Sequence, residues 1–132
     1  MSYPLSWALI PIEGFDACPL GRGRDWVRNS LGVPESVFRR APDGPLVEDY
    51  QELGVQVSYD ASDRTSLVEV ALPATPTMQG VMLLGRLAAD VYSELRAIGI
   101  DVVEDDAGAL VPGWGAGLFV AAGRVEAVSV GR

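Results

Sequence analysis

The chain has 132 residues, no histidine, a single cysteine and a net charge of −8. Without histidine it lacks the commonest zinc ligand and the usual general base near neutral pH, and a lone Cys18 excludes an intrachain disulfide. The acidic balance argues against nucleic acid as a partner, because phosphate binding requires a basic surface. With 48% hydrophobic residues, the composition is typical of one globular domain.

Targeting signals do not stand out in the sequence. The longest apolar runs are short, such as Gly80 to Leu84, whereas a membrane-spanning helix needs about 20 apolar residues. The N-terminal stretch MSYPLSWALIPIEGF has no basic leading region and no small-residue cleavage site. We therefore expect a single domain over residues 1–132, located in the cytoplasm, with no membrane partner.

The first forty residues predict mainly helix and irregular structure. Residues 7–12 suggest a short strand or extended arm, which Pro11 would confine to a sheet edge. Residues 20–32 have apolar side chains at helical spacing and end at Gly32, which favours a helix of two to three turns. Residues 33–38 fit either an extended link or a single helical turn, and Pro34 at a first helical position favours the turn.

The next segment predicts a β-meander. Residues 40–45 form a Pro/Gly-rich turn, and residues 46–51 predict a first strand. The clearest hairpin covers residues 52–72, where apolar and polar side chains alternate in 55–59 and again in 68–72. Short turn-forming side chains join these two strands at residues 60–63.

A Pro/Thr linker at residues 73–77 divides the chain near its midpoint, and the strongest helix signal follows it, from about residue 83 to 98. Its apolar stripe consists of Leu84, Leu87, Ala88, Val91, Leu95 and Ile98. Residues 100–103 and 109–111 predict a second hairpin around an acidic turn. A last pair of strands is expected at about 116–120 and 125–130.

The two parts of the chain contain matching short motifs. Leu20-Gly21-Arg22 matches Leu84-Gly85-Arg86, Leu53-Gly54 matches Trp114-Gly115, and Arg64 matches Arg124. We interpret this as an internal repeat with halves at about 14–72 and 78–131. The predicted fold class is α+β, a duplicated helix-plus-meander with one antiparallel sheet and helices packed on one face.

The phrases LGRGRDWVRNSLGVPES and YQELGVQVSYD resemble the β-lactamase-inhibitor-protein-like fold, which small outer-membrane-assembly lipoproteins also share. The chain departs from both, since it has neither a lipobox cysteine near Met1 nor a cysteine pair. The resemblance implies a scaffold that binds proteins through its sheet, and it implies no particular target.

The sequence shows no recognisable set of catalytic residues. Carboxylates cluster at Asp60/Asp63 and in 101–106, but both groups fall in predicted turns, whereas acid–base work requires a buried carboxyl group with a shifted pKa. The acidic turn lacks the alternating D-x-D-x-D-G pattern of a calcium loop. We therefore expect no enzyme, no catalytic residues, no cofactor and no metal.

Partner-binding candidates come from strand alternation and charge. Phe119 should point away from the core side chains Leu118 and Val120, so it is a candidate anchor, particularly if Trp114 and Tyr50, which are also candidates, lie near it. The alternative is that both faces of this strand are covered, for example by the N-terminal arm. Asp105 and Asp106 are further candidates, because residues 42–132 carry a net charge of −9.

We therefore predict a non-catalytic protein-binding module of the inhibitor or immunity type. The acidic surface would steer it to a basic enzyme such as a nuclease. The alternative is a small-molecule-binding domain with an apolar pocket between the halves, lined by residues such as Met78, Met82 and Tyr92. An enzyme using carboxylates and arginine ranks last. The sequence leaves open the partner, the oligomeric state (a homo-oligomer included) and which sheet face is exposed.

Overall fold

The computed structural model describes residues 5–131, and its main feature is one large antiparallel sheet. Eight strands lie in the order β10-β11-β12-β13-β7-β6-β5-β4. In chain order these strands are β4 (Ser36–Arg39), β5 (Leu46–Tyr50), β6 (Val55–Tyr59), β7 (Thr65–Ala71), β10 (Val103–Glu104), β11 (Gly108–Val111), β12 (Ala116–Ala121) and β13 (Arg124–Gly131). The predicted meanders are thus present, and β7 and β13 join them edge to edge in the middle of the sheet.

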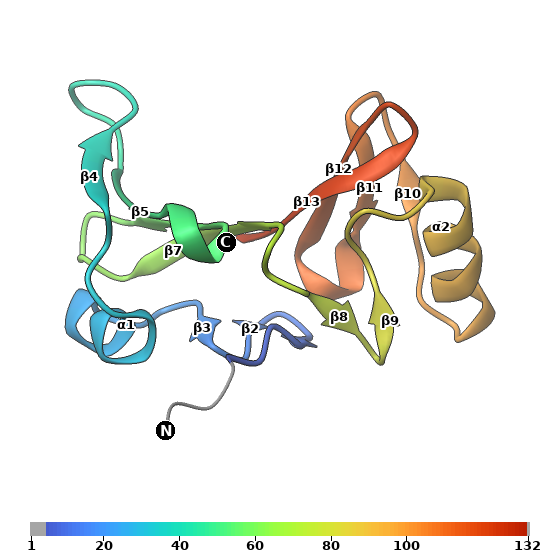
Figure 1. Cartoon of the computed structure of the whole chain (residues 1–132), viewed down its shortest axis with the longest axis horizontal. Helices are drawn as coiled ribbons and strands as arrows, with labels where there is room; N and C mark the ends of the chain where they lie inside the picture. Colours follow the sequence, from blue (N-terminus) through green and yellow to red (C-terminus); the bar gives the residue numbers. More distant parts are fainter. Residues whose placement is uncertain (1–4, 132) are drawn as a thin grey trace.

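Small elements and two short helices complete the chain. They are β1 (Leu9–Ile10), β2 (Gly14–Phe15), β3 (Cys18–Pro19), α1 (Arg24–Leu31), η1 (Gln51–Leu53), β8 (Thr77–Met78), β9 (Val81–Met82), α2 (Ala88–Ala97) and η2 (Pro112–Trp114). Strands β1–β3 form one small sheet and β8–β9 another. Figure 1 shows both beneath the large sheet, with α1 and α2 at opposite ends of the long axis.

This arrangement overturns the predicted fold class. Of the residues that the structure describes, 43% lie in strands and 19% are helical, and the two helices do not form a layer on one sheet face. The reason is that α1 buries only Val27, while the middle of the sheet is covered by the two-residue strands of the N-terminal arm and of β8–β9. Strands this short leave too little periodicity in the sequence to be recognised.

Two local predictions are corrected. Of the two alternatives for residues 33–38, the favoured helical turn is wrong and the extended one holds, because residues 36–39 pair with β5 as the edge strand β4. The second helix begins at Ala88 and not at residue 83. The backbone of Gly85 and Arg86 instead bonds to Val125, with Gly85 N donating to Val125 O at 2.8 Å and Val125 N donating to Arg86 O at 3.0 Å.

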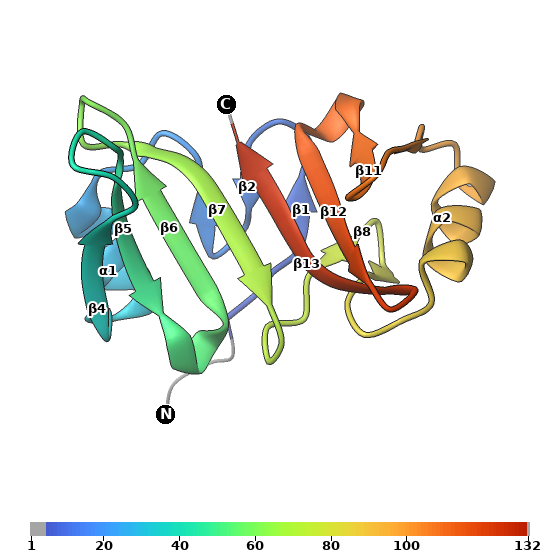
Figure 2. The ribbon, with the colours of Figure 1, turned by 90° about the horizontal axis from the view of Figure 1, so that it is seen from above.

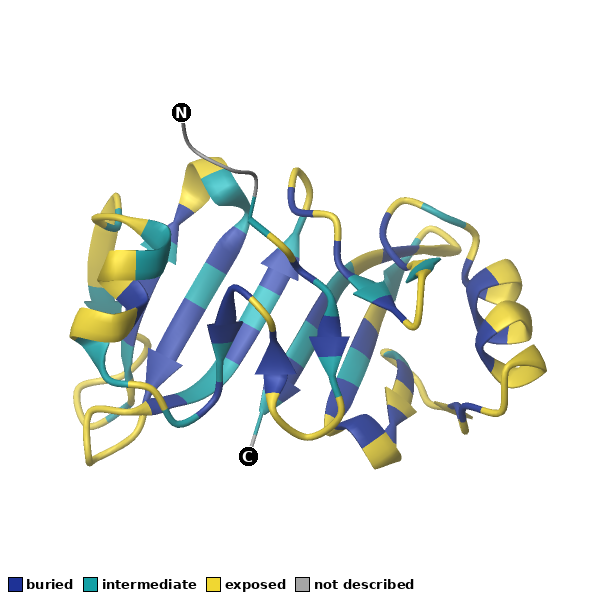
Figure 3. Ribbon diagram, turned by 90° about the horizontal axis from the view of Figure 1, so that it is seen from below, coloured by how far each residue is buried: buried dark blue, intermediate teal, exposed yellow. Residues whose placement is uncertain are grey.

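The sheet has one covered and one open face. Side chains of the inner face pack in the core between the large sheet and the two small sheets. They include Tyr50, Val55, Val57, Val68, Val70, Leu118, Val128 and Val130. Figure 3 shows this alternation as bands of buried and intermediate residues along the central strands. Figure 2 shows the other side from above, and within residues 5–131 no second layer lies over it. We call this side the outer face.

The N-terminal half of the sheet (β4–β7) and the C-terminal half (β10–β13) contain matching backbone hydrogen bonds. Gly21 N donates to Thr65 O at 2.8 Å, as Gly85 N does to Val125 O. The Arg64 guanidinium donates to Gly21 O and that of Arg124 to Gly85 O. The origin of these halves in one repeated unit stays a prediction.

Neither helix among the described residues is long and apolar enough to cross a membrane.

Candidate functional site on the outer face

One row of paired residues crosses the outer face from edge to edge, and its chemistry changes on the way. From β4 to β10 the register runs Ser36, Asp49, Gln56, Glu69, Ser129, Gly117, Leu110 and Val103. The row is therefore polar and acidic over β5–β7, small over β13 and β12, and apolar over β11 and β10.

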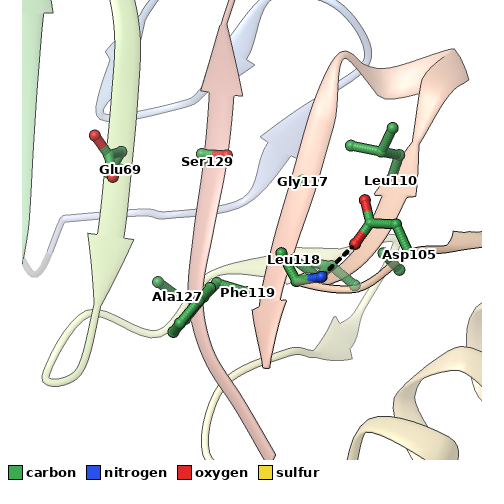
Figure 4. A pocket seen from close by; sticks show the side chains of 10 residues that line it. Glu69, Asp105, Leu110, Gly117, Leu118, Phe119, Ala127 and Ser129 are labelled. Carbon is green, nitrogen blue, oxygen red and sulfur yellow. Dashed lines mark hydrogen bonds between the residues drawn. The ribbon is translucent and has the colours of Figure 1, made fainter. Parts of the chain in front are cut away.

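The apolar end of the row surrounds a groove of about 500 Å³. Phe119 on β12 and Leu110 on β11 are both about half exposed, at 53% and 49%. Phe119 pairs with Ala127 on β13, and Figure 4 shows these two side chains next to each other, with Leu110 and Asp105 on one side and Glu69 on the other. Gly117 has no side chain and Ala127 has only a methyl group, so neither fills the groove.

The Phe119 side chain is exposed because the β10–β11 turn beside it is short. The residue that corresponds to Phe119 in the N-terminal half is Ser58: Ser58 follows the left-handed Gly54 by four residues, as Phe119 follows the left-handed Gly115. Ser58 is buried although it points to the outer face, as is its register partner Val47. The β4–β5 turn in this half is longer and sends Arg40 across the outer face to β6 and β7. In the C-terminal half, the β10–β11 turn folds back on Asp105.

The structure brings together only part of the five predicted partner-binding residues, since Phe119 and Asp105 line one groove while Trp114 and Tyr50 do not. Phe119 lies on the open face, but Trp114 (8% exposed) and Tyr50 (1% exposed) are buried in the core. Tyr50 follows Asp49, which points outward, so alternation places it inward. The Asp105 carboxylate accepts hydrogen bonds from Ala107 N and Gly108 N at 3.0 and 2.8 Å, and it lines the groove. Asp106 is exposed in the same turn.

A buried polar cluster under β5 was not predicted. The Glu48 carboxylate is fully buried and accepts hydrogen bonds from the Tyr59 hydroxyl at 2.8 Å, from the Tyr50 hydroxyl at 3.5 Å and from Arg28 Nε at 3.0 Å. The signal was present in the alternation of Leu46, Glu48 and Tyr50, which puts the carboxylate on the inner face. The bond to Glu48 raises the pKa of the Arg28 guanidinium, and Arg28 Nη2 lies 2.5 Å from Glu48 Oε2.

Burial controls the titration of the neighbouring groups. Loss of solvent and then the nearby Glu48 charge raise the pKa of the Cys18 thiol to about 12. Burial and contact with Glu48 also raise the pKa values of Tyr50 and Tyr59. These groups stay protonated near neutral pH, and the buried side-chain polar atoms of the described residues all have hydrogen-bond partners. The cluster therefore has the features of a satisfied structural network.

No family model matches this chain, and neither the curated proteins nor the solved structures include a significant match. The resemblance to the β-lactamase-inhibitor-protein-like fold therefore stays a prediction.

Proposed function

We propose that this protein is a non-catalytic protein-binding module of the inhibitor or immunity type, which covers a basic partner with its outer face. The observation that carries the proposal is the half-exposed Phe119, set beside Leu110 in an open groove on a sheet face that the described residues leave uncovered. Aromatic side chains in such grooves are the usual anchors of protein–protein interfaces.

The charge around the groove defines the partner's chemistry. Glu69 and Asp105 line the groove, and Asp49 lines a neighbouring groove of about 280 Å³. Residues 42–132 carry a net charge of −9, so long-range attraction favours a positively charged surface. A basic protein that presents an apolar side chain next to its positive charges would complement this face. A cytoplasmic location remains a prediction.

The structure offers no specific support for the alternative of a small-molecule pocket between the halves. Met78 and Tyr92 are buried in the core, whereas Met82 is exposed on β9. None of the three lines either groove of the outer face.

The test is affinity capture with Phe119→Ser and a matched control, Val33→Ser. Val33 is also an exposed apolar residue, but it lies between α1 and β4, away from the outer face. We expect a basic protein to be retained by the wild type and by Val33→Ser and to be lost by Phe119→Ser, with all three chains folded by thermal melt. Hydrogen exchange of the purified complex should protect β11 and β12. Retention by folded Phe119→Ser, or protection confined to other elements, would reject the outer face as the binding surface.

Electrostatic steering has its own test, for which Asp106 is the better choice. Substitution of Asp105 would also remove two hydrogen bonds of the turn, whereas Asp106 is exposed beside it. Asp106→Lys should slow association with the captured partner and weaken the salt dependence of the rate. An unchanged association rate would exclude steering by this turn.

A further inference from the structure

The guanidinium group of Arg40 is bound to side chains of the outer face. Arg40, in the turn after β4, places Nη2 2.8 Å from Gln56 Oε1 and 3.2 Å from Glu69 Oε1. Gln56 and Glu69 are register partners on β6 and β7, so their side chains form a pair of acceptors on adjacent strands. Both members of the Arg40–Glu69 ion pair remain partly exposed, at 47% and 38%.

Glu69 lies where the two grooves of the outer face meet. It lines the groove that contains Phe119 and Leu110, and it also lines the groove that contains Asp49 and Gln56. Ala127 is the other residue shared by both. Any protein segment that fills the first groove and extends toward the acidic half of the sheet must therefore pass the position where Arg40 is bound.

We propose that Arg40 is an internal placeholder, and that the partner supplies an arginine which replaces it on Gln56 and Glu69. This inference rests on the proposed function. An exposed ion pair contributes little to stability, so Arg40 exchanges readily with solvent. The incoming guanidinium restores the same charge-assisted hydrogen bonds, so Glu69 stays paired when Arg40 leaves.

The sheet geometry sets the spacing of the partner's side chains. Glu69 on β7 and Phe119 on β12 are separated by β13, which makes about 10 Å across the strands at roughly 4.8 Å per strand. Glu69 is in register with Gly117, and Phe119 lies two residues farther along β12, which adds about 7 Å along the strands. The partner segment thus carries an arginine and an apolar side chain about 12 Å apart. On a helix this is a separation of about two turns, since each turn rises 5.4 Å.

The first test uses the full chain and a small probe, N-acetyl-arginine methylamide, with the uncharged N-acetyl-citrulline methylamide as its control. Amide chemical shifts are followed by NMR during titration of the wild type, Arg40→Ala and Arg39→Ala. Arg39→Ala removes the same charge one residue away, on a side chain that donates to Gly44 O. Removal of an exposed ion pair of ordinary strength predicts about two- to fivefold tighter probe binding by Arg40→Ala.

We expect the shifts to centre on Gln56, Glu69 and Ser129, and to disappear with the citrulline probe and in the double variant Arg40→Ala, Glu69→Gln. Equal binding of the two probes, or equal gains in Arg40→Ala and Arg39→Ala, would overturn the assignment of a guanidinium site.

The captured partner separates this inference from the proposed function. If the partner is lost by Phe119→Ser and weakened by Glu69→Gln, and is bound more tightly by Arg40→Ala, both proposals stand. If Phe119→Ser abolishes capture while neither Glu69→Gln nor Arg40→Ala changes the affinity, the placeholder is refuted and the binding module remains. If Phe119→Ser has no effect, the proposed function fails, and the probe titration alone decides whether the outer face binds guanidinium.

Discussion

Glu48 and Ala109 occupy matching positions on β5 and β11. Glu48 pairs with Val57 and Ala109 with Leu118, and each of these partners follows a left-handed glycine by three residues. At this position the C-terminal half of the sheet therefore has the methyl group of Ala109, whereas the N-terminal half has the Glu48 carboxylate, which is bonded to Arg28 and two tyrosines. This contrast makes the buried ion pair a specific feature of the N-terminal half and not a requirement of the sheet.

Glu48→Gln should lower the free energy of unfolding by roughly 1–3 kcal/mol. A glutamine keeps one acceptor oxygen but turns an amide group toward donors that were satisfied by the carboxylate, and buried donors left unpaired cost about this much. Urea denaturation measures the change. Glu126→Gln, which removes the same charge at an exposed site of β13, should change stability by less than about 0.5 kcal/mol. Equal stabilities of the two variants would show that the cluster contributes nothing.

The raised pKa of Cys18 predicts a loss of stability in mild alkali. The thiol has an ordinary pKa of 9.0, which burial raises to about 12 in the folded protein. Below pH 9 both states hold the proton. Between pH 9 and 12 the unfolded chain binds fewer protons than the folded one, so the free energy of unfolding falls by roughly 1.4 kcal/mol per pH unit.

Cys18→Ala isolates this effect, because Tyr50 and Tyr59, whose pKa values are also raised, lower stability only from about pH 10 upward. Urea titrations at pH 8, 9 and 10 should show the wild type losing about 1 kcal/mol more than Cys18→Ala over this range. Parallel losses would mean that the thiol titrates in the folded protein as it does in the unfolded chain.

The long strands were predictable from the sequence, and the layer that covers them was not. Alternation placed β5, β6, β7, β12 and β13 nearly correctly, because most of their apolar side chains point to the inner face. The cover consists of two-residue strands held by backbone bonds such as Ala17 N to Ser6 O at 2.9 Å, which carry no side-chain pattern. The predicted helix began too early, since its stripe includes two residues that precede α2, the buried Leu84 and the exposed Leu87.

The candidate site was predictable in part for the same reason. Alternation correctly predicted that Phe119 points to the outer face, because that prediction needs only one strand. It could not show that the β4–β5 turn sends Arg40 to Gln56 and Glu69, or that Ser58 is buried while its counterpart Phe119 is half exposed. The partners of Arg40 are 16 and 29 residues away in the sequence, so their contact depends on tertiary structure.

Gly54 and Gly115 provide a matched pair for testing the packing where each half turns from its 3-10 helix into the following strand. Both have left-handed φ angles, +75° and +64°. A Cβ atom on Gly54 would lie 2.3 Å from Ala71 O and 2.7 Å from Leu72 O, whereas one on Gly115 would meet only Gly131 O at 3.5 Å. The N-terminal half is therefore tightly closed at this point, and the C-terminal half has room for a methyl group.

Gly115→Ala should cost about 1–2 kcal/mol, the ordinary price of a left-handed conformation for a residue with a Cβ atom. Gly54→Ala should cost several kcal/mol more, because backbone oxygen atoms of β7 and Leu72 must also move and the bond from Ala71 N to Gly54 O, at 2.7 Å, would be broken. Urea denaturation of both variants measures the difference, and hydrogen exchange at Ala71 and Gly131 locates it. Equal costs in the two variants would mean that β7 relaxes freely around residue 54, in conflict with the close packing found there.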